Sequence, residues 1–384
     1  MRFHMDSKIP ILFVIVQMGM GGAERLVYNL CSKLDRSLFR PSVAWFYGEK
    51  ALKEFVDLDI PLHFIPKRRR FDPETIVQFA RLVKNLQIKV VNAHHFMSYV
   101  YLFPGAKILN NTKLIYTEHS SWELDRLPKR WRLVGKRMFG KLDHFVGVSN
   151  EVSRTAEDIF GADPGKYVTI LNGVDLSLFE NSAAREVCRE RIGINHGDIV
   201  IGNVANFRKV KNHLHLIKAF QALSENHRNV KLLLVGKGFE DDPENTESEV
   251  RRYISEHRLD RTIICLGYRS DIPDLMGCMD IFCLTSRMEG LPISLIEAMA
   301  AGLPIVGTDV DGIRSVVQNG VNGFLVPPED VGVLEHQFQM LVENQNLRTI
   351  MGQAGKNLAK SLYSLDSCVL NYQRLYSDTV GIKN

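Results

Sequence analysis

The sequence predicts an α/β protein made of two Rossmann-like domains, each with a doubly wound parallel sheet. Three observations predict this architecture. The 384 residues exceed one ordinary core, short apolar runs alternate with helical patterns, and the alternation starts again after residue 172. Ligands bind beyond the carboxyl ends of the strands in such sheets, so we expect two binding edges that face each other across a cleft.

The composition is that of an ordinary globular protein. Apolar residues make up 45% and charged residues 24%, and a net charge of +4 does not argue for nucleic acid. The apolar run at residues 9–20 lacks a basic flank and a cleavage site, so we interpret it as a buried strand rather than a signal peptide. None of the six cysteines forms a C-x-x-C pair, so we expect reduced thiols and no zinc.

The first domain is expected over residues 1–172 and the second over residues 173–362. Strands of the first are predicted at residues 9–16, 41–47, 62–65, 89–93, 113–117 and 144–148, with helices at 23–34 and 73–85. Strands of the second are predicted at residues 198–205, 231–235, 262–266, 280–284, 304–308 and 323–326. Residues 363–384 are expected to form a helix that packs back on the first domain.

A glycine-rich turn joins the first strand to the first helix. Gly19, Gly21 and Gly22 permit close backbone approach, and the following helix offers free N–H groups to an anion. The spacing is not G-x-G-x-x-G, and no acidic residue stands at the usual ribose position. These absences argue against an NAD-dependent dehydrogenase and leave either an anion site or a tight turn without a ligand.

Two carboxylates stand eight residues apart in the second domain, at Glu289 and Glu297. Pro292 is typical of a helix start, so Glu289 is expected in the preceding loop and Glu297 within the helix. Carboxylates accept hydrogen bonds from sugar and ribose hydroxyls, whereas free helix N–H groups bind phosphate. The alternative is a surface glutamate and a helix-dipole glutamate. The amides expected to hold a diphosphate belong to Gly290, Leu291 and Ile293.

Cations and histidines follow other predicted strands. Arg208 and Lys211 are suited to neutralise a leaving diphosphate, although a solvated basic loop is the alternative. His94 and His95 end one strand, and His119 follows another. Strand carboxyl ends should line the cleft, so these histidines are candidate ligand-binding residues; the alternative is a structural role.

These residues together resemble the retaining glycosyltransferases of family 4, whose fold is called GT-B. Residues 289–306 are similar to the family's E-x7-E signature and the EAMA-x-G-x-P segment that follows it. Residues 21–25 and 117–120 resemble a subgroup common in bacterial capsule, exopolysaccharide and O-antigen biosynthesis. The resemblance covers nearly the whole chain.

The resemblance implies a role for each candidate residue. His119 would contact the donor sugar near the reacting carbon, Lys211 the phosphates and Glu289 the hydroxyls of the transferred sugar. Glu297 would hold the ribose. The remaining donor-binding candidates are Gly21, Gly22, Gly236, Tyr268, Arg269, Gly290, Leu291, Pro292 and Ile293. The family's usual arginine is replaced in the segment 205–207, and Arg208 is expected to supply the guanidinium from another backbone position.

No cofactor and no metal are expected. Asp309 and Asp311 form a D-x-D pair, which marks metal-dependent glycosyltransferases of another fold, but here the pair follows a buried strand in a turn. Lys211 and helix N-termini can do the electrostatic work of a metal ion. No pair of carboxylates is arranged as in retaining hydrolases, so we expect front-face transfer with retention.

Two basic stretches predict contact with an anionic membrane surface. They are residues 67–71 and residues 126–141, and the second interleaves cations with Trp131 and other apolar residues. The alternative is a solvated helix packed on its domain. A membrane-facing enzyme fits a lipid-linked saccharide acceptor, so we expect a cytoplasmic protein that is peripheral at the inner face of the cell membrane.

The donor is expected to be a UDP-sugar, with GDP-mannose second, and the transferred group a hexose or N-acetylhexosamine. Two other functions stay open. A non-hydrolysing nucleotide-sugar epimerase shares this architecture and works without an acceptor. A non-catalytic two-lobed sugar-binding protein would normally carry an export signal.

Overall fold

The computed structural model describes residues 8–19, 21–48, 50–69, 72–108, 112–161, 163, 165–180, 185–239 and 242–382. The chain divides into two compact units: unit 1 comprises residues 1–172 and 365–384, and unit 2 comprises residues 173–364. Each unit contains one sheet, and every strand pairing is parallel. The predicted fold of two parallel α/β domains is therefore confirmed.

Unit 1 holds a seven-stranded sheet in the order β3-β2-β1-β4-β5-β6-β7. In the parallel register, Ile9 of β1 stands beside Phe39 of β2, and Ile11 stands beside Val90 of β4. Both faces of the central strand are covered, because Ile11 to Ile15 are fully buried. The strands are β1 (Ile9–Gln17), β2 (Phe39–Tyr47), β3 (Leu62–Phe64), β4 (Val90–His94), β5 (Lys113–Glu118), β6 (His144–Gly147) and β7 (Tyr167–Thr169).

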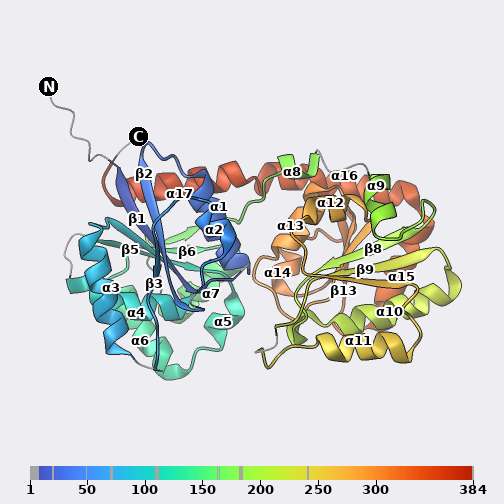
Figure 1. Ribbon diagram of the computed structural model, residues 1–384, viewed down its shortest axis with the longest axis horizontal. Coiled ribbons are helices and arrows are strands. Elements are labelled where there is room, and N and C mark those ends of the chain that lie inside the picture. Colours follow the sequence, from blue (N-terminus) through green and yellow to red (C-terminus); the bar gives the residue numbers. More distant parts are fainter. Residues whose placement is uncertain are drawn as a thin grey trace. The chain divides into compact units, whose positions relative to one another are not determined.

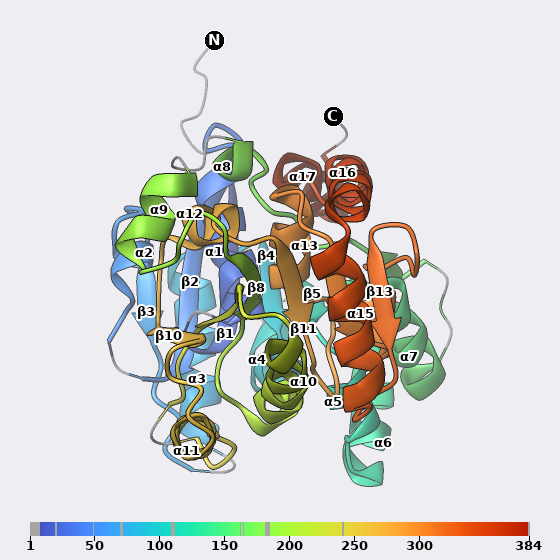
Figure 2. The ribbon, with the colours of Figure 1, turned by 90° about the vertical axis from the view of Figure 1, so that its right-hand side faces the viewer.

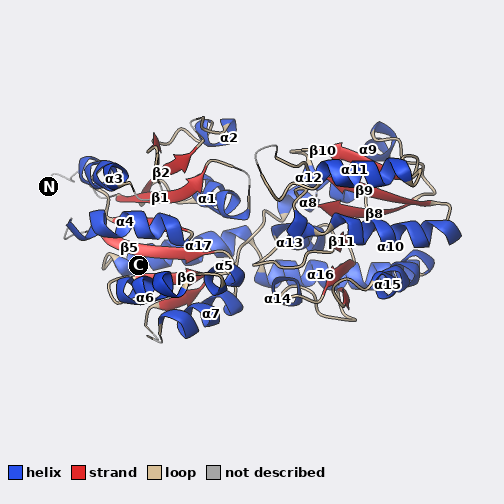
Figure 3. Cartoon of the chain, turned by 90° about the horizontal axis from the view of Figure 1, so that it is seen from below, coloured by secondary structure: helices blue, strands red, loops and turns tan. Residues whose placement is uncertain are grey.

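Helices lie on both faces of the unit 1 sheet (Figure 3). They are α1 (Gly22–Lys33), α2 (Lys53–Val56), α3 (Pro73–Asn85), α4 (Phe96–Ile108), α5 (Ser121–Asp125), α6 (Lys129–Phe139), α7 (Asn150–Phe160) and the C-terminal α17 (Leu365–Thr379). Helix α1 packs against α17, α3 against α4, and α6 against α7.

Local signals explain where these helices begin. Asp72 caps α3 by accepting a hydrogen bond from the amide of Glu74 at 3.2 Å, and Pro73 occupies the first helical position, where its missing N–H costs nothing. Ser149 caps α7 in the same way through the amide of Val152 at 3.2 Å. Each cap marks the point where the loop from the preceding strand ends and the helix begins.

The C-terminal helix α17 belongs to the core of unit 1. The side-chain amide of Asn92 on β4 donates to the hydroxyl of Tyr376 at 2.8 Å, and the Tyr376 ring packs edge-on against Phe13 and Phe39. Tyr376 is fully buried. The last helix therefore completes the first unit, although it is more than 190 residues away from the end of that unit's main segment.

Unit 2 holds a six-stranded sheet in the order β10-β9-β8-β11-β12-β13. Its strands are β8 (Ile199–Val204), β9 (Val230–Val235), β10 (Ile263–Gly267), β11 (Ile281–Leu284), β12 (Ile305–Thr308) and β13 (Gly323–Val326). Its helices are α8 (Ser177–Glu180), α9 (Arg185–Arg191), the short 3₁₀ helix η1 (Lys209–Lys211), α10 (His213–Asn226), α11 (Glu247–Glu256), α12 (Ile272–Gly277), α13 (Ile293–Ala300), α14 (Asp311–Arg314), α15 (Val331–Glu343) and α16 (Gln345–Leu362).

The hydrophobic core of unit 2 lies between its sheet and the neighbouring helices. Figure 2 shows α10 and α15 beside each other, and these two helices are in direct contact. Leu216 and Phe220 of α10 pack with Phe338 of α15 and with Leu232 of β9, all fully buried. This core holds the strands rigidly, so the loops at their carboxyl ends have a fixed base. The bounds of both units can be followed in Figure 1.

The structure shows the state of the cysteines and the absence of a membrane-spanning helix among the described residues. Cys188 at α9 and Cys278 at the end of α12 form a disulfide, which corrects the expectation that all six cysteines are reduced thiols. The other four, Cys31, Cys265, Cys283 and Cys368, form no disulfide in the described part of the chain. Among the helices that the structure describes, none is both long and apolar enough to cross a membrane.

Candidate functional site

The loops after β8 and β11 are joined at the carboxyl edge of the unit 2 sheet. The amide of Arg287 donates to the carbonyl of Val210 at 2.8 Å, and the Thr285 hydroxyl donates to the carbonyls of Lys211 and Asn212 at 3.3 and 3.2 Å. Asn212 has a left-handed backbone, with φ of 52°, where η1 turns into α10. These bonds fix the backbone from which Lys211 projects relative to the loop that carries Glu289.

Lys211 and Glu289 meet across these two loops. The Nζ atom of Lys211 lies 2.6 Å from Oε1 of Glu289, and the hydroxyl of Ser286 donates to the same oxygen at 2.5 Å. Both side chains are mostly buried, with 21% and 9% of their surfaces exposed. The carboxylate is thereby oriented, and a cation is held beside it. The sequence analysis did not single out Ser286, because a serine in a loop carries no distinctive signal.

The amides after Glu289 are available at the start of α13. In the described part of unit 2, no hydrogen-bond acceptor is present for the amides of Gly290, Leu291 and Ile293. Pro292 is the N-cap and offers no capping side chain. Unsatisfied N–H groups at a helix N-terminus attract an anion. The structure therefore brings the cation, the carboxylate and the predicted phosphate-binding amides together in one unit.

Gly312 explains how closely α14 approaches this loop. A Cβ atom at Gly312 would lie 2.5 Å from the carbonyl oxygen of Glu289 and 2.3 Å from that of Gly290. Real Cβ atoms do not come so near, so any larger residue would push the loop away. Glu297, one turn into α13, is partly buried on the same helix.

Arg208 has a different partner from the one expected. Its Nε atom pairs with Oδ2 of Asp242 at 2.7 Å, in the loop between β9 and α11. Neighbouring backbone bonds hold this arrangement, because the amide of Lys209 donates to the carbonyl of Glu244 at 2.8 Å. The Arg208 guanidinium thus has a carboxylate partner within the chain, and its role at the diphosphate stays a prediction.

The loops after β9 and β10 carry the donor-binding candidates Gly236, Tyr268 and Arg269. Gly236 has φ of 145°, and a Cβ atom there would meet the carbonyl oxygen of Ala205 at 1.9 Å, so close backbone packing already requires this glycine. Tyr268 exposes 52% of its surface. The ammonium of Lys237 lies 5.9 Å from the Tyr268 ring and 5.5 Å from that of Phe239, which is also half exposed.

Arg269 forms a two-point contact with Asp271, at 2.7 and 2.5 Å. The hydrogen bond with Asp271 raises the pKa of the Arg269 guanidinium further. Arg269 is therefore held in place, next to the exposed Tyr268 ring in the chain.

Both carboxylates of the D-x-D pair contact one arginine. Nε of Arg314 lies 2.7 Å from Asp309, and its Nη1 lies 2.9 Å from Asp311. The hydrogen bond that Arg314 donates to Asp309 raises the pKa of the guanidinium. These two carboxylates thus have a counter-charge within the chain, which favours the structural interpretation of the pair.

In unit 1, the start of α1 contains its own carboxylate. Gly21 is the N-cap, and a Cβ atom there would lie 2.6 Å from Oε2 of Glu24, whereas a Cβ atom at Gly22 would meet nothing within 4 Å. Glu24 is 7% exposed. Burial raises the pKa of Glu24, against the opposing effect of backbone N–H groups and the charge of His95. An anion that approaches Gly21 and Gly22 must therefore accommodate Glu24.

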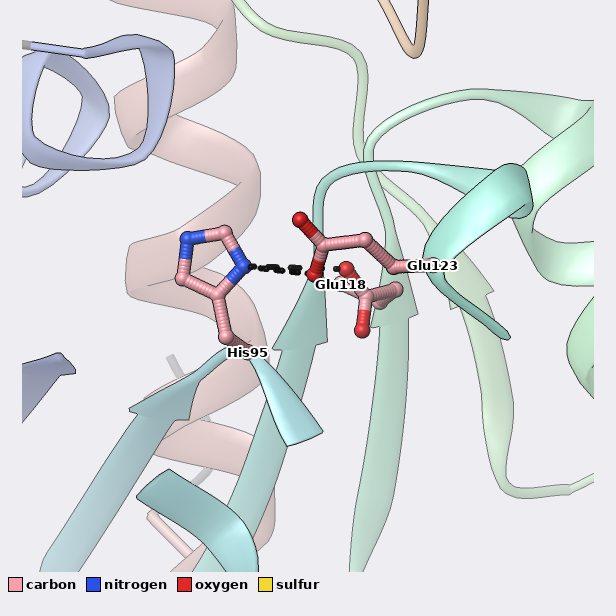
Figure 4. Close-up of side chains that lie close together, drawn as sticks. All are labelled: His95, Glu118 and Glu123. Carbon is pink, nitrogen blue, oxygen red and sulfur yellow. Dashed lines mark hydrogen bonds and ion pairs between the residues drawn. The ribbon is translucent and has the colours of Figure 1, made fainter. Parts of the chain in front are cut away.

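Three charged side chains converge at the carboxyl ends of β4 and β5 (Figure 4). Nδ1 of His95 lies 3.3 Å from Oε2 of Glu123 on α5 and 3.9 Å from Oε1 of Glu118. Glu118 is fully buried, and His95 has a left-handed backbone with φ of 68°. The sequence placed His95 and Glu118 at strand ends but missed Glu123, because a glutamate in a short helix carries no signal for a partner 28 residues away.

The charges in this cluster balance through His95. Burial alone would lower the pKa of His95, but its hydrogen bond with Glu123 and the charges of Glu123, Glu118 and Glu24 raise the pKa to about 9. Burial, followed by the charge of Glu123, raises the pKa of Glu118. One ligand atom from each of His95, Glu118 and Glu123 lies within 4.8 Å of the others, a spacing that can hold a cation. The His95 imidazolium already supplies the positive charge there, so we assign no metal to this cluster.

Glu118 and His94 together hold His119. Oε1 of Glu118 accepts the backbone amides of His119 at 2.7 Å and Ser120 at 3.3 Å, and its other oxygen accepts the Tyr116 hydroxyl. Nδ1 of His94 lies 2.9 Å from Nε2 of His119, and the two rings are stacked. His119 is partly exposed, whereas His94 is fully buried. The predicted residue His119 thus has a fixed backbone and a fixed ring.

Only part of the surface of the basic helix α6 is exposed to solvent. Met138 and Phe139 are buried, and Trp131 packs edge-on against Phe96. The exposed surface contains Leu133 and Val134, 69% and 41% exposed. The exposed cations beside them are Lys129, Arg130, Lys136 and Arg137. In the other basic stretch Lys67 bonds the Tyr47 hydroxyl at 2.7 Å, whereas residues 70 and 71 lie outside the described residues.

Two family profiles match this chain. The family profile "Glycosyltransferase Family 4" matches residues 20–178, and "Glycosyl transferases group 1" matches residues 184–358. The chain is 24% identical to the UDP-Gal:alpha-D-GlcNAc-diphosphoundecaprenol alpha-1,3-galactosyltransferase of Escherichia coli, over 97% of this chain and 98% of that protein. It is 27% identical to the N-acetyl-alpha-D-glucosaminyl L-malate synthase of Bacillus anthracis, over 81% and 80%.

A solved structure shares the fold. The Anabaena protein Alr3699/HepE, crystallised in complex with UDP and glucose, superimposes with a TM-score of 0.84 at 20% identity, over 96% of this chain and 99% of that chain. The two profiles together match most of the sequence, and the carboxylate pair of the family signature stands at the start of α13. The chain is therefore a glycosyltransferase of family 4 with the GT-B fold.

Proposed function

We propose that this enzyme transfers a hexose or N-acetylhexosamine from a UDP-sugar to a lipid-linked saccharide, with retention of configuration and without a metal ion. The pathway would be the synthesis of a cell-surface polysaccharide. The observation that carries the proposal is the contact of Lys211 with Glu289 directly before the unsatisfied amides of α13. The cation and the amides suit the diphosphate of a sugar nucleotide, and the carboxylate suits its sugar.

Each group suits one part of the donor. The Lys211 ammonium and the amides of Gly290 and Leu291 would bind the diphosphate, because all are hydrogen-bond donors and the ammonium is charged. Glu289 would accept hydrogen bonds from hydroxyls of the transferred sugar, and Glu297 from the ribose. In the free enzyme the Lys211 ammonium pairs with Glu289. When the donor binds, the ammonium would also contact a phosphate oxygen, so its attraction to Glu289 would be shared with the phosphate.

A UDP-sugar is favoured over GDP-mannose by the comparisons. The E. coli relative is named for UDP-Gal, and the Anabaena structure contains UDP and glucose. The exposed rings of Tyr268 and Phe239 beside Lys237 offer stacking surfaces and a donor for a base with carbonyl oxygens, a property of both uracil and guanine. GDP-mannose is therefore the second candidate.

The proposed chemistry is front-face substitution. The bond between C1 of the sugar and the phosphate oxygen breaks ahead of attack, and both electrons leave with the diphosphate. The acceptor hydroxyl then attacks C1 from the same face, and its proton passes to the leaving phosphate oxygen. The protein supplies position and charge stabilisation rather than a nucleophile. Lys211 would stabilise the negative charge that develops on the phosphate.

Metal independence fits the same picture. Lys211 provides the positive charge at the proposed diphosphate site, and Arg314 already pairs with both Asp309 and Asp311. A divalent ion at the D-x-D pair would have to displace that guanidinium.

The acceptor is proposed to be lipid-linked, and the enzyme to be cytoplasmic and peripheral at the inner face of the membrane. The support comes from the E. coli relative, whose name includes a diphosphoundecaprenol acceptor, and from the exposed stripe on α6. Arg130, Leu133, Val134 and Arg137 stand at helical spacing on that stripe, two aliphatic residues between two cations. Anionic headgroups would attract the cations, and the aliphatic side chains would enter the interface.

The donor can be identified by a panel of UDP- and GDP-sugars in a thermal-shift assay, since a ligand at 100 times its Kd stabilises by roughly 2.7 kcal/mol. Nucleoside diphosphate release is then measured with and without lipid extracts. Release that depends on the extract, with the product anomer matching the donor, supports retaining transfer. Interconversion of the sugar without an acceptor would identify an epimerase, and binding without turnover a sugar-binding protein.

A further inference from the structure

The three neighbouring histidines of unit 1 differ in their hydrogen bonding. His95 pairs with carboxylates, whereas His94 and His119 contact each other through ring nitrogens. Burial, reinforced by the positive charge of His95, lowers the pKa of both His94 and His119, so both rings are neutral near pH 7. A neutral imidazole carries one N–H and one lone pair. The single hydrogen bond between Nδ1 of His94 and Nε2 of His119 therefore contains one proton, held by one of the two rings.

The surroundings of His94 decide which ring donates. Its other nitrogen, Nε2, is buried and has no hydrogen-bond partner in the described part of the chain. If His119 donated, His94 would have to carry its proton on Nε2, as a buried N–H without an acceptor. If His94 donates from Nδ1, only a lone pair is left at Nε2. Buried orphan N–H groups are the rarer case in native proteins, so the second arrangement is favoured.

The consequence concerns the exposed side of His119. When Nε2 of His119 accepts from His94, its own proton must be on Nδ1. In the described residues Nδ1 of His119 has no hydrogen-bond partner, and His119 is partly exposed. We propose that His94 is a positioning residue that holds His119 in its neutral Nδ1–H form, so that His119 offers a hydrogen-bond donor to an oxygen atom of the bound substrate.

This form excludes one role for His119. Its only lone pair is already used by His94, so His119 cannot remove a proton from the acceptor hydroxyl. The acceptor proton must leave by another route, as in transfer to the leaving phosphate. The tautomer assignment does not depend on the proposed function. The statement that His119 contacts an oxygen atom of the donor substrate rests on the proposed function.

The tautomer can be measured directly in the full-length chain. The protein is labelled with ¹⁵N-histidine, and long-range ¹H–¹⁵N correlation spectra at neutral pH distinguish protonated from bare ring nitrogens. Signals of His94 and His119 are assigned by their loss in His94→Asn and His119→Gln. We expect protonated Nδ1 and bare Nε2 in both rings. A proton on Nε2 of either ring, or a doubly protonated His119, would overturn the proposal.

Two substitutions of His94 form a matched pair. In His94→Asn the amide nitrogen takes the place of Nδ1 and still donates, whereas in His94→Leu a methyl group stands there. We expect His119 to keep its Nδ1–H signal in His94→Asn and to lose it in His94→Leu. Circular dichroism and Tm values check that both variants fold.

Turnover of the two variants tests the link to catalysis. For His94→Leu, kcat for nucleoside diphosphate release from the UDP-sugar should fall by about 10-fold, because the hydrogen bond that orients His119 is lost. For His94→Asn, kcat should stay near the wild-type value. Equal rates in both variants would refute the positioning role. If the wild type shows the expected tautomer but releases no nucleoside diphosphate from any donor, the proposed function fails while the tautomer assignment stands.

Discussion

The Nζ atom of Lys211 lies 2.6 Å from the Oε1 atom of Glu289, although 78 residues separate them in the chain. The pair joins the loop after β8 to the loop before α13, and Ser286 bonds the same carboxylate oxygen. For the proposed function, this contact would orient the Glu289 carboxylate and the Lys211 ammonium before the donor binds.

Neutralising either member of this pair should cost activity rather than folding. We expect Lys211→Ala and Glu289→Ala each to lower kcat/KM for nucleoside diphosphate release by on the order of 10²–10³-fold, because each loses charge stabilisation or sugar contacts. Glu343→Gln is the control, since Glu343 on α15 is exposed and pairs with His227 at 3.2 Å. Near-wild-type turnover of both test variants would remove Lys211 and Glu289 from the site.

A methyl group at Gly312 should disturb the site from behind. In Gly312→Ala the new Cβ atom would displace the carbonyls of Glu289 and Gly290, so we expect kcat/KM to fall by about 10–100-fold and stability by about 1–3 kcal/mol. Gly332→Ala in α15 is the matched control, because its Cβ atom would meet nothing closer than 3.7 Å. Equal activity of the two variants would show that the loop position is not critical.

The stability of unit 1 should depend on the charge of His95. The pKa of His95 is raised from 6.5 in the unfolded chain to about 9 in the folded chain, so its stabilising effect is complete below pH 6.5 and is lost as pH rises through 9. His95→Asn keeps a residue that tolerates the left-handed backbone but removes the charge. We expect it to reduce the free energy of unfolding by on the order of 2–3 kcal/mol at pH 6–7.

Denaturant unfolding from pH 6 to pH 10 measures this difference. The gap between wild type and His95→Asn should narrow as pH rises from about 6.5 to 9 and should be nearly absent above pH 9, where wild-type His95 is also neutral. A gap that stays constant across this range would mean that packing, not charge, explains the effect of the substitution.

Chelation tests the proposed metal independence. Dialysis against EDTA is expected to leave turnover unchanged, because Lys211 supplies the positive charge at the proposed diphosphate site. Loss of turnover that Mn²⁺ or Mg²⁺ restores would contradict this expectation. In that event, Asp309→Asn and Glu123→Gln would show whether the ion binds at the D-x-D pair or at the cluster of His95, Glu118 and Glu123.

Vesicle binding tests the exposed stripe on α6. Leu133→Ser should weaken binding to anionic vesicles by about 10-fold, because an aliphatic side chain no longer enters the interface. Ile350→Ser on α16 is the control, since Ile350 is 66% exposed and Leu133 is 69% exposed. Binding should need anionic lipid and weaken with salt. If wild type binds no vesicles at any salt concentration, a soluble acceptor becomes the better proposal.

Helix α4 shows where sequence patterns fail. No helix is predicted for residues 96–108. Pro104 interrupts this segment, and its apolar residues are not confined to one helical face, so the periodic pattern of an amphipathic helix is missing. In the structure α4 packs against α3 and against β1, β4 and β5. A helix that is covered on several sides needs no polar face, so its type depends on neighbours that come from other parts of the chain.

The partners of charged residues show the same limit. The Arg208 guanidinium pairs with Asp242, and the D-x-D carboxylates pair with Arg314, and neither partner is predicted from the sequence. Sequence distance does not reveal which opposite charge a long side chain reaches. Glu123 was overlooked for the same reason.

Strand periodicity, turn residues and the E-x7-E signature are local properties, so the residues were enough to predict the fold class, the family and the places where ligand-binding loops leave the sheets. Three-dimensional packing was needed to show that Lys211 meets Glu289, that His94 contacts His119 and that the charges of three carboxylates act on His95. Those contacts form when parallel strands bring distant loops to one edge of a sheet. Their protonation states then follow from burial, a property that no single segment of the chain carries alone.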